Sequence, residues 1–337
     1  MRASFFYIIF IFCFFKSFSQ EISGVIVDSK TNVPIEGASV YFDNTTVGTI
    51  SDLDGLFNIT KSASINSPLV VSFLGYKKQV ISNYSTEEKL TIFLVEDIST
   101  LNEVFLESKD SWSRARKLKD FKAYFFGQTD NALSCKILNE EVLILQFLEA
   151  ENKLVASTKA PLIILNGNLK YQISYDLQDF EVTYKISNNL EDFYPTSVYY
   201  AGTSFYTSGV TNKRIIKRRN QAYKGSVMHF MRALLRGKLV KNKFKLLLNG
   251  QEVPPENFIS VYATDNPELF QVRLFKPLRV VYNNDIHNQS TITSKDTYFY
   301  LDLNGNHTPV DGLIFTGYFG KQRIADTLPL DFQLGTD

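Results

Sequence analysis

Short segments in which apolar and polar residues alternate fill the chain from Ile22 to Leu106. The segments read ISGVIVD, ASVYFD, VGTI, GLFNIT, LVVSFLG, KKQVISN and KLTIFLV. Alternation with a period of two places one face of each segment in a core, which is typical of β-strands. Gly, Asn and Pro residues between the segments mark turns. This pattern predicts seven strands in a small antiparallel sandwich of two sheets.

From Asp110 onward the pattern is again mostly that of strands. One clear helix is predicted at SVMHFMRALLRG, with Ser226 as N-cap and Gly237 as its stop. A shorter helix is predicted near Trp112, where that residue would share a face with two residues of the following turn, Ala115 and Leu118. Strands are expected at EVLILQFLEA, KLVASTK, PLIILNG, LKYQISYDLQDFEVTYKI, SVYYAGTSFY, ELFQVRLFKPLRVVYN, TSKDTYFYLDLNG and LIFTGYF. The fold class is therefore mainly β, with a second mostly-β domain that carries one or two short helices.

The first 19 residues have the layout of a secretory signal peptide. Arg2 precedes an apolar run from Phe5 to Phe15, and small Ser17 and Ser19 follow. The run is well short of the roughly 20 residues that span a bilayer as a helix. Cleavage is expected before Gln20, and an uncleaved anchor is the alternative. We expect an exported protein of the periplasm or outer-membrane periphery.

Composition limits the chemistry that the mature chain can perform. After residue 20 no apolar stretch reaches membrane-spanning length, so no transmembrane segment is expected after signal cleavage. Cys135 is then the single cysteine, which excludes an internal disulfide and a thiolate cluster for zinc. The three histidines lack the H-E-x-x-H spacing of zinc peptidases. No cofactor or metal is expected.

Residues 24–59 carry a dense motif, GVIVDSKTNVPIEGASVYFDNTTVGTISDLDGLFNI. This motif resembles the carboxypeptidase-like regulatory domain that is common in exported Bacteroidota proteins. The resemblance covers about residues 20–108 and implies a transthyretin-like, or prealbumin-like, β-sandwich. It refers to an accessory domain of metallocarboxypeptidases and not to their catalytic domain. The family pattern is filled by Gly24, Asp28, Thr31, Pro34, Ile35, Gly37, Ala38, Val40, Gly48, Thr49, Ser51, Asp52, Asp54, Gly55, Phe57 and Ile59.

Two further resemblances concern the residues that follow this domain. Leu101, Glu103 and Val104 are similar to the junction after the sandwich in TonB-dependent outer-membrane receptors. The rest of the chain is too short for the plug and barrel of such a receptor. Four segments of the second half resemble the extension after the regulatory domain in hypothetical Bacteroidota proteins, for which no activity is established: FFGQTDNALSCKILNE, NLKYQISYDLQDF, AYKGSVMHFMRALL and GYFGKQRIADTLPLDF. The predicted organisation is a signal peptide at 1–19, a regulatory sandwich at 20–108 and a mostly-β domain of unknown function at 109–337.

Two acidic loops invite comparison with calcium sites. Asp52, Asp54 and Gly55 resemble the start of an EF-hand loop, but Phe57 and Ala63 occupy the positions of the required Gly and Glu. Asp and Gly also favour turns, and this is the interpretation that we prefer. The segment DLNGN at 302–306 is interpreted as a hairpin for the same reason.

The most unusual feature is a basic block at residues 213–245, which contains twelve Lys or Arg residues and no Asp or Glu. Arg232 and Arg236 are four apart on the predicted helix and share one face. The block could bind an anionic lipid headgroup, a glycan or an acidic protein. Alternatively, its charges are paired within the molecule by an acidic segment that contains Asp176, Asp179, Glu181, Glu191 and Asp192. The candidate binding face consists of Lys217, Arg218, Arg219, Arg232 and Arg236.

Other single residues are interpreted as structural. His229 on the helix is expected to be a partly buried core histidine. No sequence signature makes Cys135 a nucleophile, and the aromatic residues of VYYAGTSFY are expected to fill a sheet. Nucleic acid is not an expected partner, because the protein is exported.

The sequence thus favours a non-enzymatic binding or scaffold protein of the cell envelope, which interacts with a protein or an anionic envelope component. The alternative is a hydrolase or glycan-processing enzyme with its site in residues 110–337. In that case carboxylates such as Asp176, Asp179 and Glu181 would perform acid–base chemistry. The position of these carboxylates in the fold distinguishes the two hypotheses.

Overall fold

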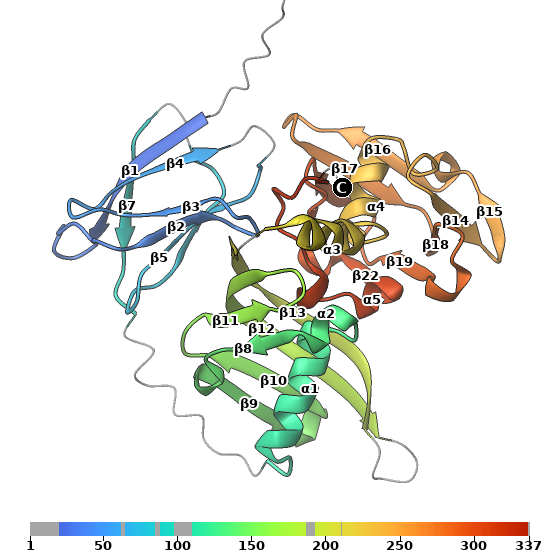
Figure 1. Cartoon of the computed structure of the whole chain (residues 1–337), viewed down its shortest axis with the longest axis horizontal. Coiled ribbons are helices and arrows are strands. Elements are labelled where there is room, and N and C mark those ends of the chain that lie inside the picture. The colour runs from blue at the N-terminus through green and yellow to red at the C-terminus, as the bar shows by residue number, and fades with distance from the viewer. Residues whose placement is uncertain are drawn as a thin grey trace, which may run out of the picture.

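A computed structural model describes residues 20–61, 65–84, 88–97, 110–186, 193–209 and 211–335. The predicted signal peptide, the predicted domain boundary near residue 108 and the junction residues Leu101, Glu103 and Val104 lie outside these ranges. The described residues form three units, each with its own hydrophobic cluster (Figure 1). We refer to them as the N-terminal sandwich (20–97), the central unit (110–209) and the C-terminal unit (211–323). The C-terminal segment, 324–335, runs between them.

The N-terminal sandwich contains the seven predicted strands in two sheets. One sheet has the order β4-β1-β7 and the other β3-β2-β5-β6. The β1–β7 pair is parallel, so the expectation of a purely antiparallel sandwich was wrong in this detail. The strands are β1 (Gln20–Asp28), β2 (Ser39–Phe42), β3 (Gly48–Ile50), β4 (Leu56–Lys61), β5 (Leu69–Ser72), β6 (Gln79–Ile81) and β7 (Leu90–Leu94).

The alternating pattern of the sequence has its physical counterpart in the burial of these strands. In β4, Phe57 and Ile59 are buried while the residues between them are exposed. They pack with Ile22, Ile26 and Phe42 from other strands in one cluster. The mainly β fold class and the β-sandwich are therefore confirmed.

The central unit is a six-stranded sheet with a helix packed on one face. Strands β8, β11, β12, β10 and β9 follow one another, and β13 pairs with the full length of β12. Phe121 and Phe125 of α1 contact Phe180 and Tyr175 of β12, with ring centroids 4.7 and 5.0 Å apart. The elements are α1 (Arg114–Phe126), α2 (Asp130–Leu133), β8 (Cys135–Ile137), β9 (Leu143–Leu148), β10 (Lys153–Thr158), β11 (Leu162–Asn166), β12 (Tyr171–Ile186) and β13 (Phe193–Ser208).

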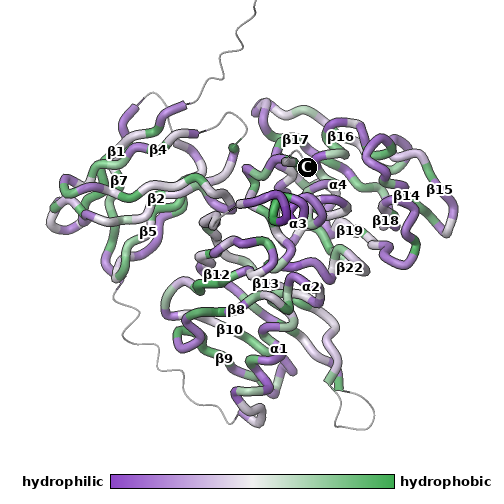
Figure 2. The backbone as a smooth tube through the Cα atoms, in the orientation of Figure 1, coloured by the Kyte–Doolittle hydropathy of each residue, from purple (hydrophilic) through white to green (hydrophobic). Residues whose placement is uncertain are grey.

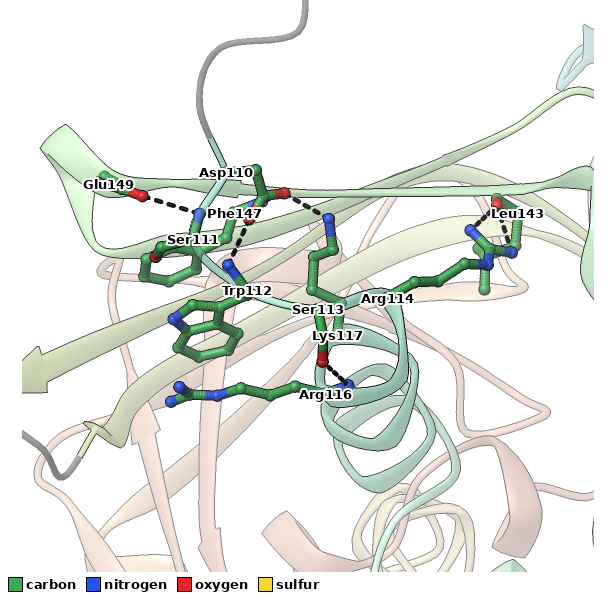
Figure 3. A network of polar contacts seen from close by, with 10 residues as sticks. All are labelled: Asp110, Ser111, Trp112, Ser113, Arg114, Arg116, Lys117, Leu143, Phe147 and Glu149. Atoms are coloured by element: carbon green, nitrogen blue, oxygen red, sulfur yellow. Dashed lines mark hydrogen bonds and ion pairs between the residues drawn. The ribbon is translucent and has the colours of Figure 1, made fainter.

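The start of the central unit is fixed by a polar network around Asp110 (Figure 3). Its carboxylate accepts hydrogen bonds from the main-chain N–H of Trp112 and of Phe147, both at 3.0 Å, and pairs with Lys117. Burial would raise the pKa of Asp110, but these bonds hold it below its ordinary value. Arg116 stacks on the Trp112 ring at 3.5 Å. The predicted short helix is confirmed as α1, but Trp112 precedes it.

The C-terminal unit encloses helix α4 between two sheets. Phe230, Met231 and Leu234 of α4 pack in one cluster with residues of both sheets, whose orders are β15-β14-β18-β19-β22 and β16-β17-β20-β21. The helices are α3 (Lys213–Tyr223), α4 (Val227–Leu235) and α5 (Tyr318–Lys321). The strands are β14 (Phe244–Leu248), β15 (Gln251–Val253), β16 (Ile259–Ala263), β17 (Leu269–Leu274), β18 (Leu278–Tyr282), β19 (Ser290–Ser294), β20 (Phe299–Asp302), β21 (His307–Thr308) and β22 (Leu313–Gly317).

The predicted caps of α4 are confirmed. The Ser226 side chain accepts a hydrogen bond from the N–H of His229, and Gly237 adopts a left-handed φ of 57° just after the helix. Helix α3 was not among the predicted elements. Its buried side includes Arg219 and Asn220, and the segment is strongly polar overall, with five cations in eleven residues, so it lacks the apolar stripe that identified α4. Figure 2 accordingly draws most of α3 in purple.

The turn between β2 and β3 attaches the N-terminal sandwich to the other two units. Main-chain bonds join Asn44 N–H to Ser204 C=O at 2.8 Å and Tyr206 N–H to Thr45 C=O at 2.9 Å. The N–H of Leu330 in the C-terminal segment donates to the C=O of Asn44 at 2.6 Å. The backbone of the sandwich thus continues into the hydrogen bonding of β13.

Side chains reinforce this attachment. Asp43 accepts from the N–H of Ser204 at 2.8 Å, and Lys78 pairs with Asp176 of β12 at 2.7 Å. Burial raises the pKa of Asp43 to about 6. This carboxylate therefore titrates well above its ordinary range, at the contact between two units.

Candidate functional site

The basic block forms helices α3 and α4 and the loop that follows α4. Eight of its cations are exposed, and they lie on α3, on its C-cap and on this loop. Asn242 in the loop bonds the His229 ring at 3.0 Å, and the same ring accepts the N–H of Gly225 at the α3–α4 turn. The loop therefore lies beside the end of α3. We call these eight residues the basic surface: Lys213, Arg214, Lys217, Lys224, Arg236, Lys238, Lys241 and Lys243.

The candidate residue Arg219 is buried and committed to the central unit. Its guanidinium donates to the main-chain oxygens of Leu169 and Lys170 at 2.8 and 3.1 Å, and it stacks on the Tyr171 ring at 3.7 Å. Arg218 is half-buried beside it and donates at 3.5 Å to the oxygen of Asn168. Carbonyl oxygens, rather than carboxylates, receive these two positive charges.

Arg232 is likewise buried, with 5% of its surface exposed. Its Nε donates to the main-chain oxygen of Asn304 at 2.8 Å, and its two terminal nitrogens donate to those of Phe332 and Leu330 at 2.9 Å each. The residue thus ties α4 to the turn after β20 and to the C-terminal segment. Burial lowers the pKa of Arg232, and the positive charge of nearby Arg236 lowers it further.

A cavity of about 240 Å³ opens beside these two arginines. Arg232 and Arg236 lie one helical turn apart in its wall, with Leu235 between them. Amide side chains and apolar groups from distant segments complete it. The other lining residues are Phe270, Leu303, Asn304 and Gln333.

The structure therefore divides the five candidate residues. Arg232 and Arg236 meet at one cavity, and Lys217 is exposed on α3. Arg218 and Arg219 instead contact the central unit. Sequence reasoning missed Phe270, Asn304 and Gln333. They come from three segments of the chain, and no local spacing connects them with the helix.

The acidic segment does not pair with the basic block in the way that the sequence suggested. Asp176 pairs with Lys78 at 2.7 Å, and Glu181 pairs with Lys153 at 3.4 Å. Glu191 and Asp192 lie outside the described residues. Among the described ion pairs of the block, Lys245 contacts Glu252. The proposed neutralisation by Asp176 and Glu181 was wrong, because these carboxylates hold the sandwich and the central sheet instead.

The same contacts bear on the alternative of a carboxylate active site. Asp176, Asp179 and Glu181 follow one another on β12, on the face opposite the buried Tyr175, Leu177 and Phe180. Two of the three are engaged by lysines. Within the described ranges, His, Cys, Asp and Glu side chains form no group of three that could hold a metal ion.

Both acidic loops are turns in the structure. One carboxylate oxygen of Asp52 accepts the N–H groups of Asp54 and Leu56, at 3.0 and 2.8 Å. Asp302 accepts those of Asn304 and Asn306 at 2.8 and 2.9 Å. Each carboxylate thus closes its own turn. The second turn also contains the main-chain oxygen of Asn304, which accepts a hydrogen bond from Arg232.

The remaining residues considered from the sequence, His229, Cys135 and the aromatic residues of VYYAGTSFY, lie in buried or hydrogen-bonded environments. Both ring nitrogens of His229 are hydrogen-bonded, to Gly225 and Asn242, and burial lowers its pKa, so the ring is neutral. Burial raises the pKa of Cys135 to about 12, which disfavours the thiolate needed for nucleophilic attack. Tyr206 of the aromatic segment is buried in the core of the central unit. The interpretation of these residues as structural agrees with their contacts.

Comparison with known proteins concerns mainly the N-terminal part of the chain. Residues 22–106 match the CarboxypepD_reg-like domain, so the resemblance is confirmed. A stretch of 96 residues is 36% identical to the TonB-dependent receptor SusC of Bacteroides thetaiotaomicron and covers 28% of this chain and 9% of the receptor. The chain therefore spans under a tenth of the length of that curated relative.

A solved structure of a type II cohesin–X-dockerin complex from Acetivibrio cellulolyticus is 24% identical over 23% of this chain and 58% of the other, with a TM-score of 0.20. Throughout the described part of the chain, every helix is too short or too polar to cross a bilayer. The sandwich is of a regulatory, non-catalytic domain type. Residues 110–335 contain the cavity and the basic surface.

Proposed function

We propose that this protein is a non-enzymatic, exported binding protein of the bacterial cell envelope, and that its partner is an anionic envelope component. The observation that carries this proposal is the basic surface. Its eight cations stay exposed on α3 and the following loop, in a block of sequence without Asp or Glu. Clustered cations raise the local concentration of anions and accelerate their association. Such a surface favours binding by charge rather than catalysis.

The arrangement of α3 supports this role. Lys213 and Lys217 are four residues apart and so share one face of the helix, whereas Ile215 and Arg219 lie on the buried side. The contacts of Arg219 hold the buried side of α3 against the central unit. The outward charges are therefore presented from a rigid support, which reduces the entropy lost on binding.

The location in the envelope is supported by the regulatory-type sandwich and by its similarity to part of a TonB-dependent receptor. The proposed order along the chain remains a signal peptide at 1–19, the sandwich at 20–108 and a mostly-β domain at 109–337. In this organisation the sandwich supports the binding unit through the contacts of Asp43, Asn44 and Thr45. No chemical step is assigned to the protein.

Co-sedimentation with envelope fractions tests the proposal. The triple variant Lys213→Gln, Lys217→Gln, Lys224→Gln removes three exposed charges from α3. If each contributes up to about 1 kcal/mol near an anionic surface at low salt, binding falls by tenfold to roughly a hundredfold. Raising the salt should weaken binding of the original protein and have less effect on the variant.

A matched control removes three exposed lysines elsewhere, with Lys77→Gln, Lys136→Gln and Lys185→Gln. Its net charge equals that of the test variant, so an effect of net charge alone would weaken both equally. Equal losses would refute a localised binding surface. Metal-dependent hydrolysis of a peptide or glycan panel by the purified mature chain would refute the non-enzymatic assignment and favour the hydrolase.

A further inference from the structure

The two arginines beside the 240 Å³ cavity are unusual in their charge balance. Arg232 is nearly fully buried, yet its three hydrogen-bond acceptors are neutral main-chain oxygens. Among the described residues no carboxylate lies within 4 Å of either guanidinium. Buried charges in proteins are normally paired with an opposite charge. Here two like charges face one cavity.

The nearest acidic group, Asp302, attracts the charge of Arg232 but makes no ion pair with it, so it offsets that charge only in part. Asp302 precedes the turn that contacts Arg232, but its carboxylate accepts two N–H groups of that turn. The end of α4 also carries partial negative charge. Part of that charge is satisfied, because Gly237 and Lys238 donate their N–H groups to carbonyls of the last helical turn, at 2.9 and 2.8 Å. The helix end therefore offsets the two guanidinium charges only in part.

The hydrogen-bond donors of the two side chains are also incompletely used. A guanidinium has five N–H groups, and Arg232 donates to three main-chain oxygens and also interacts with the Tyr223 side chain. Arg236 is exposed and lines the same cavity. Together the pair offers forked donors from two directions, which is the geometry that suits phosphate oxygens.

We infer that the cavity beside Arg232 and Arg236 binds a phosphate monoester group. A phosphate monoester carries between one and a half and two negative charges at neutral pH, so one such group balances two guanidinium ions. A carboxylate would leave one of them unbalanced. Buried Arg232 forms the floor of the site, and exposed Arg236 closes over the ligand.

The remaining walls account for the organic part of the ligand. Leu235, Phe270 and Leu303 present apolar surface beside the arginines, and the amide of Gln333 lies at the exposed rim. A water molecule occupies about 30 Å³ in the liquid, so the cavity has the space of roughly eight waters. This accommodates a phosphate with a short glycerol-like ester group. The phosphate could belong to a soluble metabolite or to a lipid headgroup.

The inference deepens the proposed function, and it rests on that function only for the source of the phosphate in the envelope. Arg236 belongs both to the basic surface and to the cavity wall, but Lys213, Lys217 and Lys224 do not line the cavity. The charge variant of α3 therefore tests the proposed function, and Arg236 tests the phosphate site. A negative result in one of these tests would not contradict the other proposal.

Isothermal titration calorimetry of the full mature chain with glycerol 3-phosphate tests the site. We expect binding that weakens at least tenfold in Arg236→Gln and changes less than twofold in Lys136→Gln, which removes an exposed charge that belongs neither to the cavity wall nor to the basic surface. Arg236 is exposed, so Arg236→Gln should keep the melting temperature of the original protein. Arg236→Lys should recover only part of the affinity, because an ammonium lacks the forked donors.

Two further arms identify the source of the phosphate. Phosphatidylcholine vesicles that contain phosphatidic acid present the same group on a membrane, and pure phosphatidylcholine vesicles are their control. Tighter binding to the phosphatidic acid vesicles than to glycerol 3-phosphate, lost in Arg236→Gln, would indicate a lipid. Binding of glycerol 3-phosphate alone would indicate a soluble ligand. No binding of either at millimolar concentration, or equal losses in Arg236→Gln and Lys136→Gln, would overturn the inference.

Discussion

Gly55 in the N-terminal sandwich tests whether the motif DLDG is a turn required by the fold. It has φ +70°, and a Cβ atom added there would lie 2.5 Å from the main-chain oxygen of Ile26 on β1. That oxygen accepts the N–H of Ile35, and the N–H of Ile26 donates to Gly55 itself. Alanine at this position would therefore strain the turn and also push two paired segments apart.

Gly75 provides a matched control, because it shares the left-handed backbone conformation of Gly55 but has room for an added Cβ atom. Its φ is +84°, and no atom lies within 4 Å of the added Cβ. A left-handed conformation costs an L-residue about 1–2 kcal/mol, and overpacking adds about 1–3 kcal/mol. We expect Gly75→Ala to destabilise the sandwich by about 1 kcal/mol and Gly55→Ala by about 3 kcal/mol.

Amide hydrogen exchange followed by mass spectrometry measures this difference locally. Peptides from β1 and β4 report the opening free energy of the sandwich without interference from the other units. The single tryptophan, Trp112, lies in the central unit and does not report on this change. Equal loss of protection in Gly55→Ala and Gly75→Ala would refute the reasoning, because an added Cβ meets Ile26, Pro34 and Ile35 at position 55 and no atom within 4 Å at position 75.

Three further predictions concern the acidic turn, the unit contact and the support of α3. Millimolar calcium should leave exchange in the sandwich unchanged, because Asp52 is already used by two turn amides; calcium-dependent protection would contradict this. The pKa of Asp43 rises on folding from 3.8 to about 6, so its contribution to stability should fall as pH rises between these values, by up to roughly 3 kcal/mol. Urea titrations across this range should show a flatter profile for Asp43→Asn, and identical profiles would refute the assignment. Arg219→Leu removes the donor of the Leu169 carbonyl and the bonds to Lys170 and Ser208, and it should cost about 2–4 kcal/mol by urea titration of Trp112 fluorescence, whereas Lys217→Gln should stay within about 0.5 kcal/mol.

The sandwich could be predicted strand by strand because each of its strands shows one face to the core. β4 is the clearest example, with Phe57 and Ile59 buried and their neighbours exposed. The longer strands of the central unit were predicted for the same reason. Helix α3 was missed because buried Arg219 and Asn220 interrupt its apolar face. Strand β14 was also missed. It begins inside the basic block, where lysines on either side of Phe244 obscure the alternation of apolar and polar residues.

The candidate site could be predicted only in part from the sequence. The spacing of Arg232 and Arg236 places them on one helical face, and the structure brings both to the cavity. The sequence did not reveal that Arg232 is buried or that Arg219 faces away, since their carbonyl acceptors come from other units. Main-chain oxygens carry no sequence signal. Tertiary contacts, rather than local pattern, therefore decide which cations remain free.

The most direct test of the proposed function is photo-crosslinking in the native cell from a reactive residue placed at position 217, with position 136 on β8 as the control site. Both Lys217 and Lys136 are exposed, but they belong to α3 and to the central sheet, respectively. We expect an envelope component to be captured from position 217 and not from position 136, and the yield to fall when Lys213 and Lys224 are neutralised. Mass spectrometry then identifies the partner. Equal capture from both positions, or capture that persists after neutralisation, would contradict the assignment of the basic surface as the binding site.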